Sequence, residues 1–138
     1  MRIALLALLL LCGCAQVAPQ AAAGDLAGTS WRLVKFQGGD GRTEFPVNRS
    51  QYTFAFNTDG AFVARIDCNR GRGSWKSSGP GQLELGPMAM TRAMCAPGSM
   101  HDNVVKQMPH IRSYVIRDGH LFISLQADGG TYELEPAR

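Results

Sequence analysis

Four cysteines carry the most reactive side chains of this sequence: Cys12, Cys14, Cys68 and Cys95. A cysteine can be acylated, ligate a metal, act as a nucleophile or pair in a disulfide, and the compartment of the protein decides between these reactions. The start of the chain indicates that compartment. A short positive region precedes an apolar run that is too short to span a bilayer as a helix. We therefore expect the chain to be exported.

The cysteine at position 14 stands in a sequence typical of lipid attachment. Gly13, a small residue, precedes it, and Leu11 stands three positions before it. This arrangement resembles the lipobox of bacterial lipoproteins, in which the signal peptidase cuts before a cysteine that carries diacylglycerol. We predict a signal peptide over residues 1–13 and a lipid-bearing N-terminus at Cys14, with no other cofactor. Cys12 fits less well, because Leu11 would then occupy the position that needs a small residue.

An ordinary secretory signal, cut after Ala15 or Ala18, is the alternative. The alanine-rich, uncharged stretch that follows predicts a lipidated, flexible tether over residues 14–25. No aspartate follows Cys14, which favours the outer membrane, on the side facing the periplasm. The membrane is thus one expected partner, reached through the lipid. Nucleic acid is not an expected partner, because the formal net charge of +3 is too small to favour it.

Once Cys14 is acylated, Cys68 and Cys95 are the thiols left in the domain that we predict over residues 26–138. Two cysteines in an oxidising compartment usually pair, so we predict a Cys68–Cys95 disulfide, worth about 3 to 4 kcal/mol in the chain-entropy model. The alternative is two free thiols, one of them reactive.

The tetrapeptide Asp67-Cys68-Asn69-Arg70 combines an acid, a thiol, an amide and a base. A nucleophilic thiol would need a histidine nearby, and the spacing of the three histidines does not indicate one. Structural roles are the stronger interpretation. We expect Asn69 to satisfy the backbone of a turn or bulge, and Arg70 to pair with a carboxylate or with backbone carbonyls.

A metal site could be assembled from Cys68, Cys95 and His101, but the sequence has no close ligand pair of the C-x-x-C or H-x-x-x-H kind. A disulfide would also consume both sulfurs. We therefore predict no metal site and no catalytic residue, and we place His101 and His120 at exposed positions.

Five methionines crowd the central segment: Met88, Met90, Met94, Met100 and Met108. Methionine side chains are adaptable and can line an apolar surface that binds a partner or a lipid. We favour the interpretation that they fill the core beneath a helix, with the binding surface as the alternative. If the domain has a binding surface, we expect it on this helix and its flank.

A small β-rich domain must position these residues. Alternating apolar residues on both sides of an Asp-Gly turn predict a hairpin over residues 52–57 and 62–66, and a second one surrounds Asp118-Gly119. Further strands are predicted over residues 31–36, 73–76, 82–85 and 131–135.

One helix of about ten residues is predicted between the two hairpins. Ser99 is expected to cap it, with Asp102 at its third position, and Pro109 to end it. Met100, Val104 and Met108 would form its apolar face. The expected fold class is α+β and mostly β: a curved antiparallel sheet or partly open barrel covered by this helix.

The order of these signals resembles the META domain family, which includes heat-inducible HslJ-like proteins. The resemblance rests mainly on Cys68-Asn69-Arg70 and on Met90-Thr91-Arg92-Ala93-Met94-Cys95. It marks Asn69, Arg70, Thr91 and Arg92 as family-motif positions. It implies a small domain of envelope or secreted proteins, with links to heat stress and antibiotic tolerance and no established reaction.

These observations predict a non-enzymatic lipoprotein of the cell envelope that binds or stabilises another envelope component. One alternative is a carrier that holds an apolar small molecule or lipid in a half-open barrel. A further alternative is a thiol-dependent enzyme that uses Cys68 or Cys95.

Overall fold

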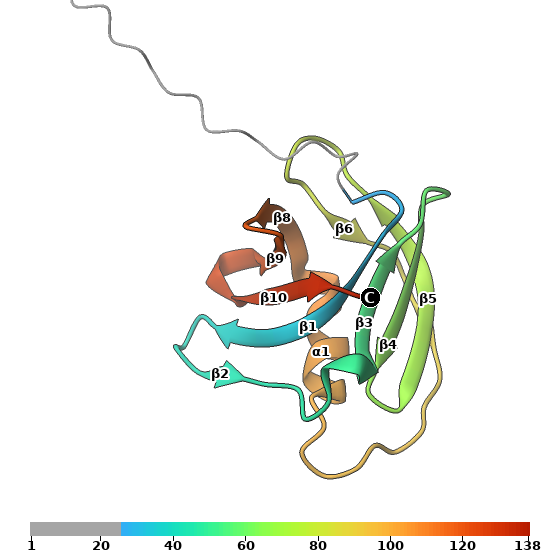
Figure 1. The fold of residues 1–138 in the computed structure, drawn as a ribbon, viewed down its shortest axis with the longest axis vertical. Helices are drawn as coiled ribbons and strands as arrows, with labels where there is room; N and C mark the ends of the chain where they lie inside the picture. Colours follow the sequence, from blue (N-terminus) through green and yellow to red (C-terminus); the bar gives the residue numbers. More distant parts are fainter. Residues whose placement is uncertain (1–25) are drawn as a thin grey trace, which may run out of the picture.

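The computed structural model describes residues 26–138, which form one curved antiparallel sheet with a short α-helix at one end (Figure 1). The predicted signal peptide over residues 1–13 and the predicted tether over residues 14–25, with Cys14, lie outside the described residues. Within residues 26–138, none of the helices is long and apolar enough to cross a membrane.

The strands, in chain order, are β1 (Thr29–Gly38), β2 (Thr43–Glu44), β3 (Tyr52–Phe56), β4 (Ala61–Ile66), β5 (Asn69–Lys76), β6 (Glu84–Leu85), β7 (Ala89–Met90), β8 (Ile111–Arg117), β9 (His120–Leu125) and β10 (Gly130–Pro136). The helix is α1 (His101–Gln107), and three short 3₁₀ turns are η2 (Arg49–Gln51), η3 (Met108–His110) and η4 (Gln126–Asp128).

The sheet is a nearly closed barrel with one seam. Its strand order is β6-β5-β4-β3-β1-β10-β9-β8, while β2 pairs with β1 and β7 pairs with β5. The chain just before β6 approaches β8 at the seam, where the Leu83 amide donates to the Arg112 carbonyl and the Tyr114 amide to the Gly81 carbonyl. These bonds do not extend along the strands, so the barrel stays partly open. The predicted fold class is confirmed.

The two predicted hairpins are confirmed. In the β3–β4 hairpin, the Asn57 amide donates to the Ala61 carbonyl and Gly60 has a φ of +81°, which glycine adopts without strain. In the β8–β9 hairpin, Asp118 and Gly119 both have positive φ, as a two-residue type I′ turn requires.

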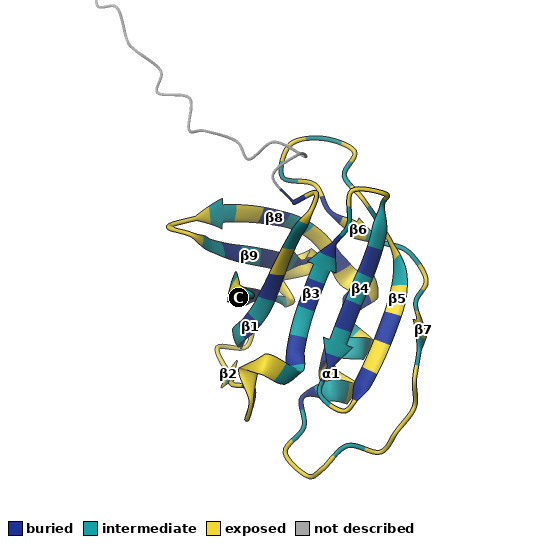
Figure 2. Ribbon diagram, turned by 45° about the vertical axis from the view of Figure 1, so that its right-hand side comes forward, coloured by how far each residue is buried: buried dark blue, intermediate teal, exposed yellow. Residues whose placement is uncertain are grey.

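The core lies between the inner face of the sheet and α1. Figure 2 shows buried and intermediate residues alternating along β3 and β4. Phe62 touches both Phe54 and Phe56, with ring centroids 5.6 and 5.2 Å apart. The helix contributes Val104 to this core, flanked by Met100 and Met108, and all three are buried. The predicted apolar face of the helix is therefore confirmed.

Two predicted strands have different bounds from those expected. β5 begins at Asn69, four residues before the predicted start, and β6 keeps only the last two residues of the predicted segment. Gln82 makes only an isolated bridge with Ser113. The start of β5 was missed because its inward positions hold Asn69, Gly71 and Gly73, which give no apolar alternation.

The start of the helix also differs from the prediction. Met100, not Ser99, is the N-cap residue, and Asp102 is the second helical residue. The Ser99 hydroxyl still accepts a hydrogen bond from the His101 amide at 3.1 Å, but Asp102 turns to the His101 ring instead of completing a capping box. The helix ends after Gln107, and η3 continues it through Pro109.

Candidate functional site

The tight turn between β4 and β5 presents the first cysteine. Ile66 pairs with Asn69, which leaves Asp67 and Cys68 as the two turn residues. Asp67 has a φ of +55°, a left-handed conformation that aspartate tolerates better than most residues. As a result, Cys68 is exposed at the turn, while Asn69 is fully buried behind it.

The predicted disulfide between Cys68 and Cys95 is present, with the two Cα atoms 5.5 Å apart. It joins the β4–β5 turn to the loop over residues 91–100, which connects β7 to α1. Cys95 is half-buried, whereas Cys68 is exposed. The alternative of two free thiols is therefore wrong for this structure.

Asn69 holds the same loop by hydrogen bonds. Its Oδ1 accepts from the Ala93 amide at 2.7 Å and from the Thr91 hydroxyl at 2.8 Å. Its Nδ2 donates to the Ala93 carbonyl at 2.9 Å and faces His101 Nε2 at 3.1 Å. The expectation that Asn69 satisfies backbone groups is confirmed, although the backbone belongs to a distant loop rather than to its own turn.

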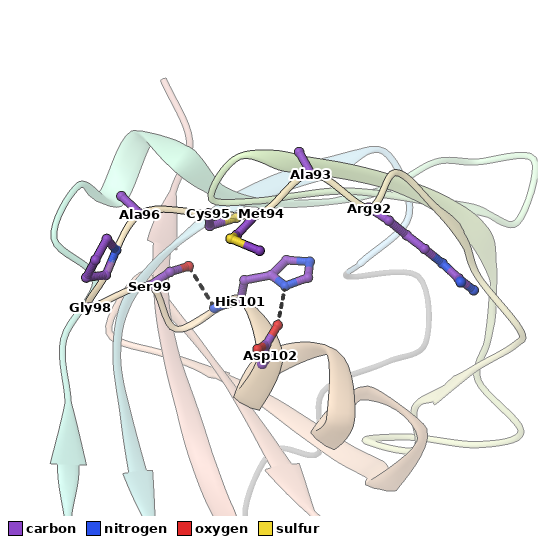
Figure 3. Close-up of a pocket in the computed structure, with 10 residues that line it drawn as sticks. Arg92, Ala93, Met94, Cys95, Ala96, Gly98, Ser99, His101 and Asp102 are labelled. Atoms are coloured by element: carbon purple, nitrogen blue, oxygen red, sulfur yellow. Dashed lines mark hydrogen bonds and ion pairs between the residues drawn. The ribbon is translucent and has the colours of Figure 1, made fainter.

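His101 completes this cluster from the first turn of α1. The Asn69 amide nitrogen can only donate, so the contact assigns His101 Nε2 as the acceptor and the ring proton to Nδ1. Nδ1 lies 2.8 Å from the Asp102 carboxylate. Figure 3 marks this contact with a dashed line. The His101 side chain is only 16% exposed, so the prediction of an exposed position is wrong.

The sulfur atoms lie next to this network. Asn69 Nδ2 is 3.4 Å from Cys68 Sγ and 3.5 Å from Cys95 Sγ. The structure thus brings a disulfide, an amide and a His–Asp pair together. Sequence reasoning grouped His101 with the two cysteines only as a metal site, which it rejected, because the one signal for His101 was a position in the first turn of the predicted helix, soon after Cys95.

All three remaining family-motif positions are exposed, and within the described part of the chain only Thr91 of the three makes side-chain hydrogen bonds. The Thr91 hydroxyl accepts from the Arg70 amide at 2.9 Å while it donates to Asn69, so it ties the loop to β5. The Arg70 and Arg92 side chains are exposed and have no hydrogen-bond or ion-pair partner among residues 26–138. The predicted pairing of Arg70 is wrong, and Arg70 instead lies directly opposite Arg65 of β4.

A cavity of about 580 Å³ opens beside the disulfide. Its lining includes Cys95 and Ser99 from the loop and His101 and Asp102 from the helix, with Arg92 at its edge (Figure 3). Met94 also lines it and is 98% exposed. The cavity is therefore bordered by the imidazole, one cysteine and the loop that the disulfide holds.

The methionines do not form one surface. Met100 and Met108 are buried in the core, Met88 and Met90 are half-buried against it, and Met94 projects into solvent. Met100 is buried and does not belong to a surface, and Met94 lines a different cavity from Met88 and Met90; that these methionines bind a partner stays a prediction. The favoured interpretation, core packing, describes Met100 and most of Met108.

A second, apolar groove of about 420 Å³ lies between the β6–β7 segment and the helix. Met88 and Met90 line it on one side, and Val105 and Met108 line it on the other. Leu85, Gly86, Pro87 and Pro109 complete the lining. We call this the methionine groove.

Glycine in β5 makes room for the methionines of this groove. A Cβ added at Gly71 would lie 2.7 Å from the terminal methyl groups of both Met88 and Met90, and one at Gly73 would lie 2.8 Å from Met88 Cγ. Contacts this short force atoms to move. The two glycines therefore let the β7 segment lie flat on β5 and fix the floor of the groove.

The resolved pKa shifts lie away from both features. Burial, with a smaller contribution from Glu44, raises the pKa of Tyr132, whose hydroxyl donates to Gln107 of α1. The hydrogen bond from Arg32 lowers the pKa of Glu135 on the outer face of the sheet. These groups support the fold, since neither lines the cavity beside the disulfide or the methionine groove.

Among residues 26–138, no group of three His, Cys, Asp or Glu side chains is placed to hold a metal ion. The polar groups near the disulfide instead bind one another. The cluster contains a disulfide with an amide donor and an imidazole beside it. The methionine groove is an apolar surface.

Comparison with known proteins supports the fold and gives the family. No curated protein sequence matches the chain. An NMR structure of a protein from Burkholderia xenovorans is similar with a TM-score of 0.69 and 21% identity, over 94% of this chain and 99% of that one. A crystal structure of a DUF4847 family protein from Bacteroides vulgatus has a TM-score of 0.59 and 15% identity, over 80% and 93%. The sequence profile of the META domain matches residues 24–138, so the chain belongs to the META domain family.

Proposed function

We propose that this META domain protein is a non-enzymatic, lipid-anchored protein of the cell envelope that binds another envelope component in its methionine groove. The observation that carries the proposal is the groove itself. It is apolar, open to solvent and about 420 Å³ in volume, which lies within the range of ordinary ligand sites.

The lining of the methionine groove supports a binding role. Met88 and Met90 are half-buried, so that they touch the core and still reach solvent. Their flexible, polarizable side chains can adapt to the shape of an apolar partner. Val105 and Met108 form an opposite wall on α1 and η3 and would keep the bound group between two elements.

The anchored location rests on the start of the sequence. Gly13-Cys14, with Leu11 before it, supplies the lipid-attachment motif, and acyl chains contribute about 0.8 kcal/mol of membrane binding per buried methylene. The tether after Cys14 would hold the domain near the outer membrane on its periplasmic side. The apolar methionine groove would then lie in a compartment that is bounded by lipid membranes.

A second candidate, a carrier of an apolar small molecule or lipid, is favoured by the volume of the same groove. The space between sheet and helix is occupied by Met100, Val104 and Met108, so a ligand would lie in the groove and not inside the barrel. The two candidates differ in what occupies the groove: part of an envelope protein or a free small molecule.

Native mass spectrometry of the full-length protein, extracted from membranes in mild detergent, tests these proposals. We expect a lipid-sized increment on Cys14 and a second mass that is lost on denaturation. The Met88→Gln variant should bind that second mass about tenfold less tightly, since an unbonded amide in an apolar contact costs about 1 to 3 kcal/mol. Met94→Gln is the matched control, because Met94 lies outside the groove.

Each outcome decides one part of the proposal. A protein-sized mass supports the envelope-component function, and a small apolar molecule supports the carrier. Equal binding by Met88→Gln and the wild type would exclude the groove as the site. An unmodified Cys14 would contradict the lipid anchor and leave the groove to be judged on the other readouts.

A further inference from the structure

We propose that the Cys68–Cys95 disulfide is a thiol–disulfide exchange site, which an external dithiol opens by attack at Cys68, while Asn69 and His101 stabilise the thiolate left on Cys95. This inference is independent of the methionine groove and of the lipid anchor. It assigns to the cluster a chemistry that goes beyond holding the loop.

Access decides which sulfur is attacked. Cys68 lies exposed at the β4–β5 turn, whereas Cys95 is half-buried in the loop. Exchange requires a thiolate to approach a disulfide sulfur in line with the bond, so the more accessible sulfur reacts first. Attack at Cys68 makes Cys95 the leaving group.

The surroundings of Cys95 suit a leaving thiolate. Asn69 Nδ2 lies 3.5 Å from Cys95 Sγ; one of its two protons is held by the Ala93 carbonyl, and the one that points at His101 Nε2 is the one that can donate to a negative sulfur. The same nitrogen lies 3.1 Å from His101 Nε2, so the amide connects the imidazole ring to the Cys95 sulfur. An amide donor and a nearby imidazole both favour a thiolate over a thiol.

Asp102 gives His101 its orientation. The carboxylate accepts from Nδ1 at 2.8 Å, which directs Nε2 toward the Asn69 amide, and that amide lies next to the sulfurs. A proton taken up at Nε2 would then be balanced by the carboxylate on the other side of the ring. The Asp102 side chain is fully exposed, so it can carry out this role without a buried charge.

The bonds and electrons of the exchange balance. A thiolate of the external dithiol forms a bond to Cys68 Sγ, the Sγ–Sγ bond breaks, and its electron pair stays on Cys95 Sγ. The second thiolate of the dithiol then attacks its own partner sulfur in the mixed disulfide and releases Cys68 as a thiolate. The dithiol loses two electrons and becomes a disulfide, and the two protons that its thiols release on forming thiolates pass to Cys68 Sγ and to His101 Nε2 beside the Cys95 thiolate.

The cavity of about 580 Å³ borders Cys95 and His101 but not Cys68. It therefore gives room to the departing sulfur and its loop, while the dithiol approaches Cys68 from the exposed β4–β5 turn. Reduction would leave the loop held at Thr91 and Ala93 by Asn69, but would free it at Cys95. The loop could then move into the cavity without separating from β5.

The test is the pH dependence of alkylation in the reduced full-length protein. Iodoacetamide labelling of Cys95, read by peptide mass spectrometry so that Cys12 and Cys14 do not contribute, should have a midpoint clearly below the ordinary thiol pKa of about 8.5. His101→Gln should return the midpoint to about 8.5. His120→Gln is the matched control, since His120 pairs with Glu133 on another part of the sheet.

Three further readouts distinguish the proposed effect from a folding defect in the His101 variant. Asp102→Asn changes an exposed side chain and should shift the midpoint in the same direction by a smaller amount. Reduction of the oxidised protein by dithiothreitol should slow about three- to tenfold in His101→Gln, because a leaving thiol of higher pKa departs more slowly. Trapping with glutathione should place the mixed disulfide on Cys68.

Three results would overturn the proposal. The first is a Cys95 midpoint near 8.5 in the wild type that does not change in His101→Gln. The second is an equal rate of reduction in the two proteins. The third is glutathione attached to Cys95 instead of Cys68.

Discussion

Replacing Asn69 by alanine should destabilise the protein more than any single change on the outer face of the sheet. Asn69 is the one buried polar residue, apart from tyrosine and tryptophan, among residues 26–138. Its side chain joins the start of β5 to Thr91, Ala93 and His101 through four hydrogen bonds. Alanine removes all four and leaves the loop with fewer attachments.

The expected loss of stability follows from these bonds. A hydrogen bond contributes about 0.5 to 1.5 kcal/mol net, so four of them give about 2 to 6 kcal/mol. Thr91 and Ala93 are exposed, and water can therefore satisfy their groups after the change. We expect a loss near the lower end of this range, about 2 to 3 kcal/mol.

Urea unfolding of the oxidised protein measures this loss. With an m-value of about 1 to 3 kcal/mol/M for a small domain, the midpoint should fall by about 0.7 to 3 M. Asn69→Asp keeps the two acceptors but faces the Ala93 carbonyl with a carboxylate, so it should also destabilise. Thr91→Val, the control, removes only the hydroxyl that links Arg70 and Asn69 and should cost about 1 to 2 kcal/mol. A loss below about 1 kcal/mol in Asn69→Ala would refute the reasoning and leave the disulfide as the main support of the loop.

Three further predictions concern the sheet. Arg70→Glu should stabilise the protein by about 0.2 to 1 kcal/mol, because it turns a like-charge pair with Arg65 into an opposite-charge pair; denaturation in low salt measures this gain, and a loss would contradict it. The Arg32–Glu135 bond lowers the pKa of Glu135, so it stabilises the folded protein at pH values above the ordinary pKa of a glutamate, and this stabilisation disappears as the pH falls through the lowered pKa. In an acid titration of the free energy of unfolding, Arg32→Gln should therefore lose less stability than the wild type. Leu33→Ala, in the fully buried centre of β1, should cost about 2 to 5 kcal/mol by thermal or urea unfolding, and a smaller cost would mean that the core relaxes around the cavity.

The parts of the fold that the sequence predicts well are those with a simple period. Alternation over residues 52–57 and 62–66 meets an Asp-Gly turn, and both signals depend only on neighbouring residues. The start of β5 breaks this rule, because Gly71 and Gly73 occupy inward positions and Met88 and Met90 fill the space from another segment. A strand whose inner face is completed by distant side chains leaves no pattern of its own.

The candidate site shows the same limit. The Cys68–Cys95 pairing could be predicted by counting thiols in an exported domain, since that argument needs no geometry. The position of His101 could not, because it depends on how an irregular loop returns the chain to the β4–β5 turn. Met94 was grouped with the other methionines for a similar reason: a residue in a loop has no periodicity that assigns it to the inside or the outside.

The loop over residues 91–100 owes its position to side-chain attachments more than to burial. Most of its residues are exposed, yet three tethers hold it: the disulfide at Cys95, the Asn69 bonds to Thr91 and Ala93, and the Tyr52 hydroxyl, which accepts from the Met100 amide at 2.9 Å. Segments with few buried contacts open at low free-energy cost, so the loop should be more responsive to reduction than the barrel. The methionine groove is different, because its walls pack directly against the core and neither cysteine of the disulfide lines it. The two features can therefore act separately, one controlled by thiol chemistry and the other by the presence of an apolar partner.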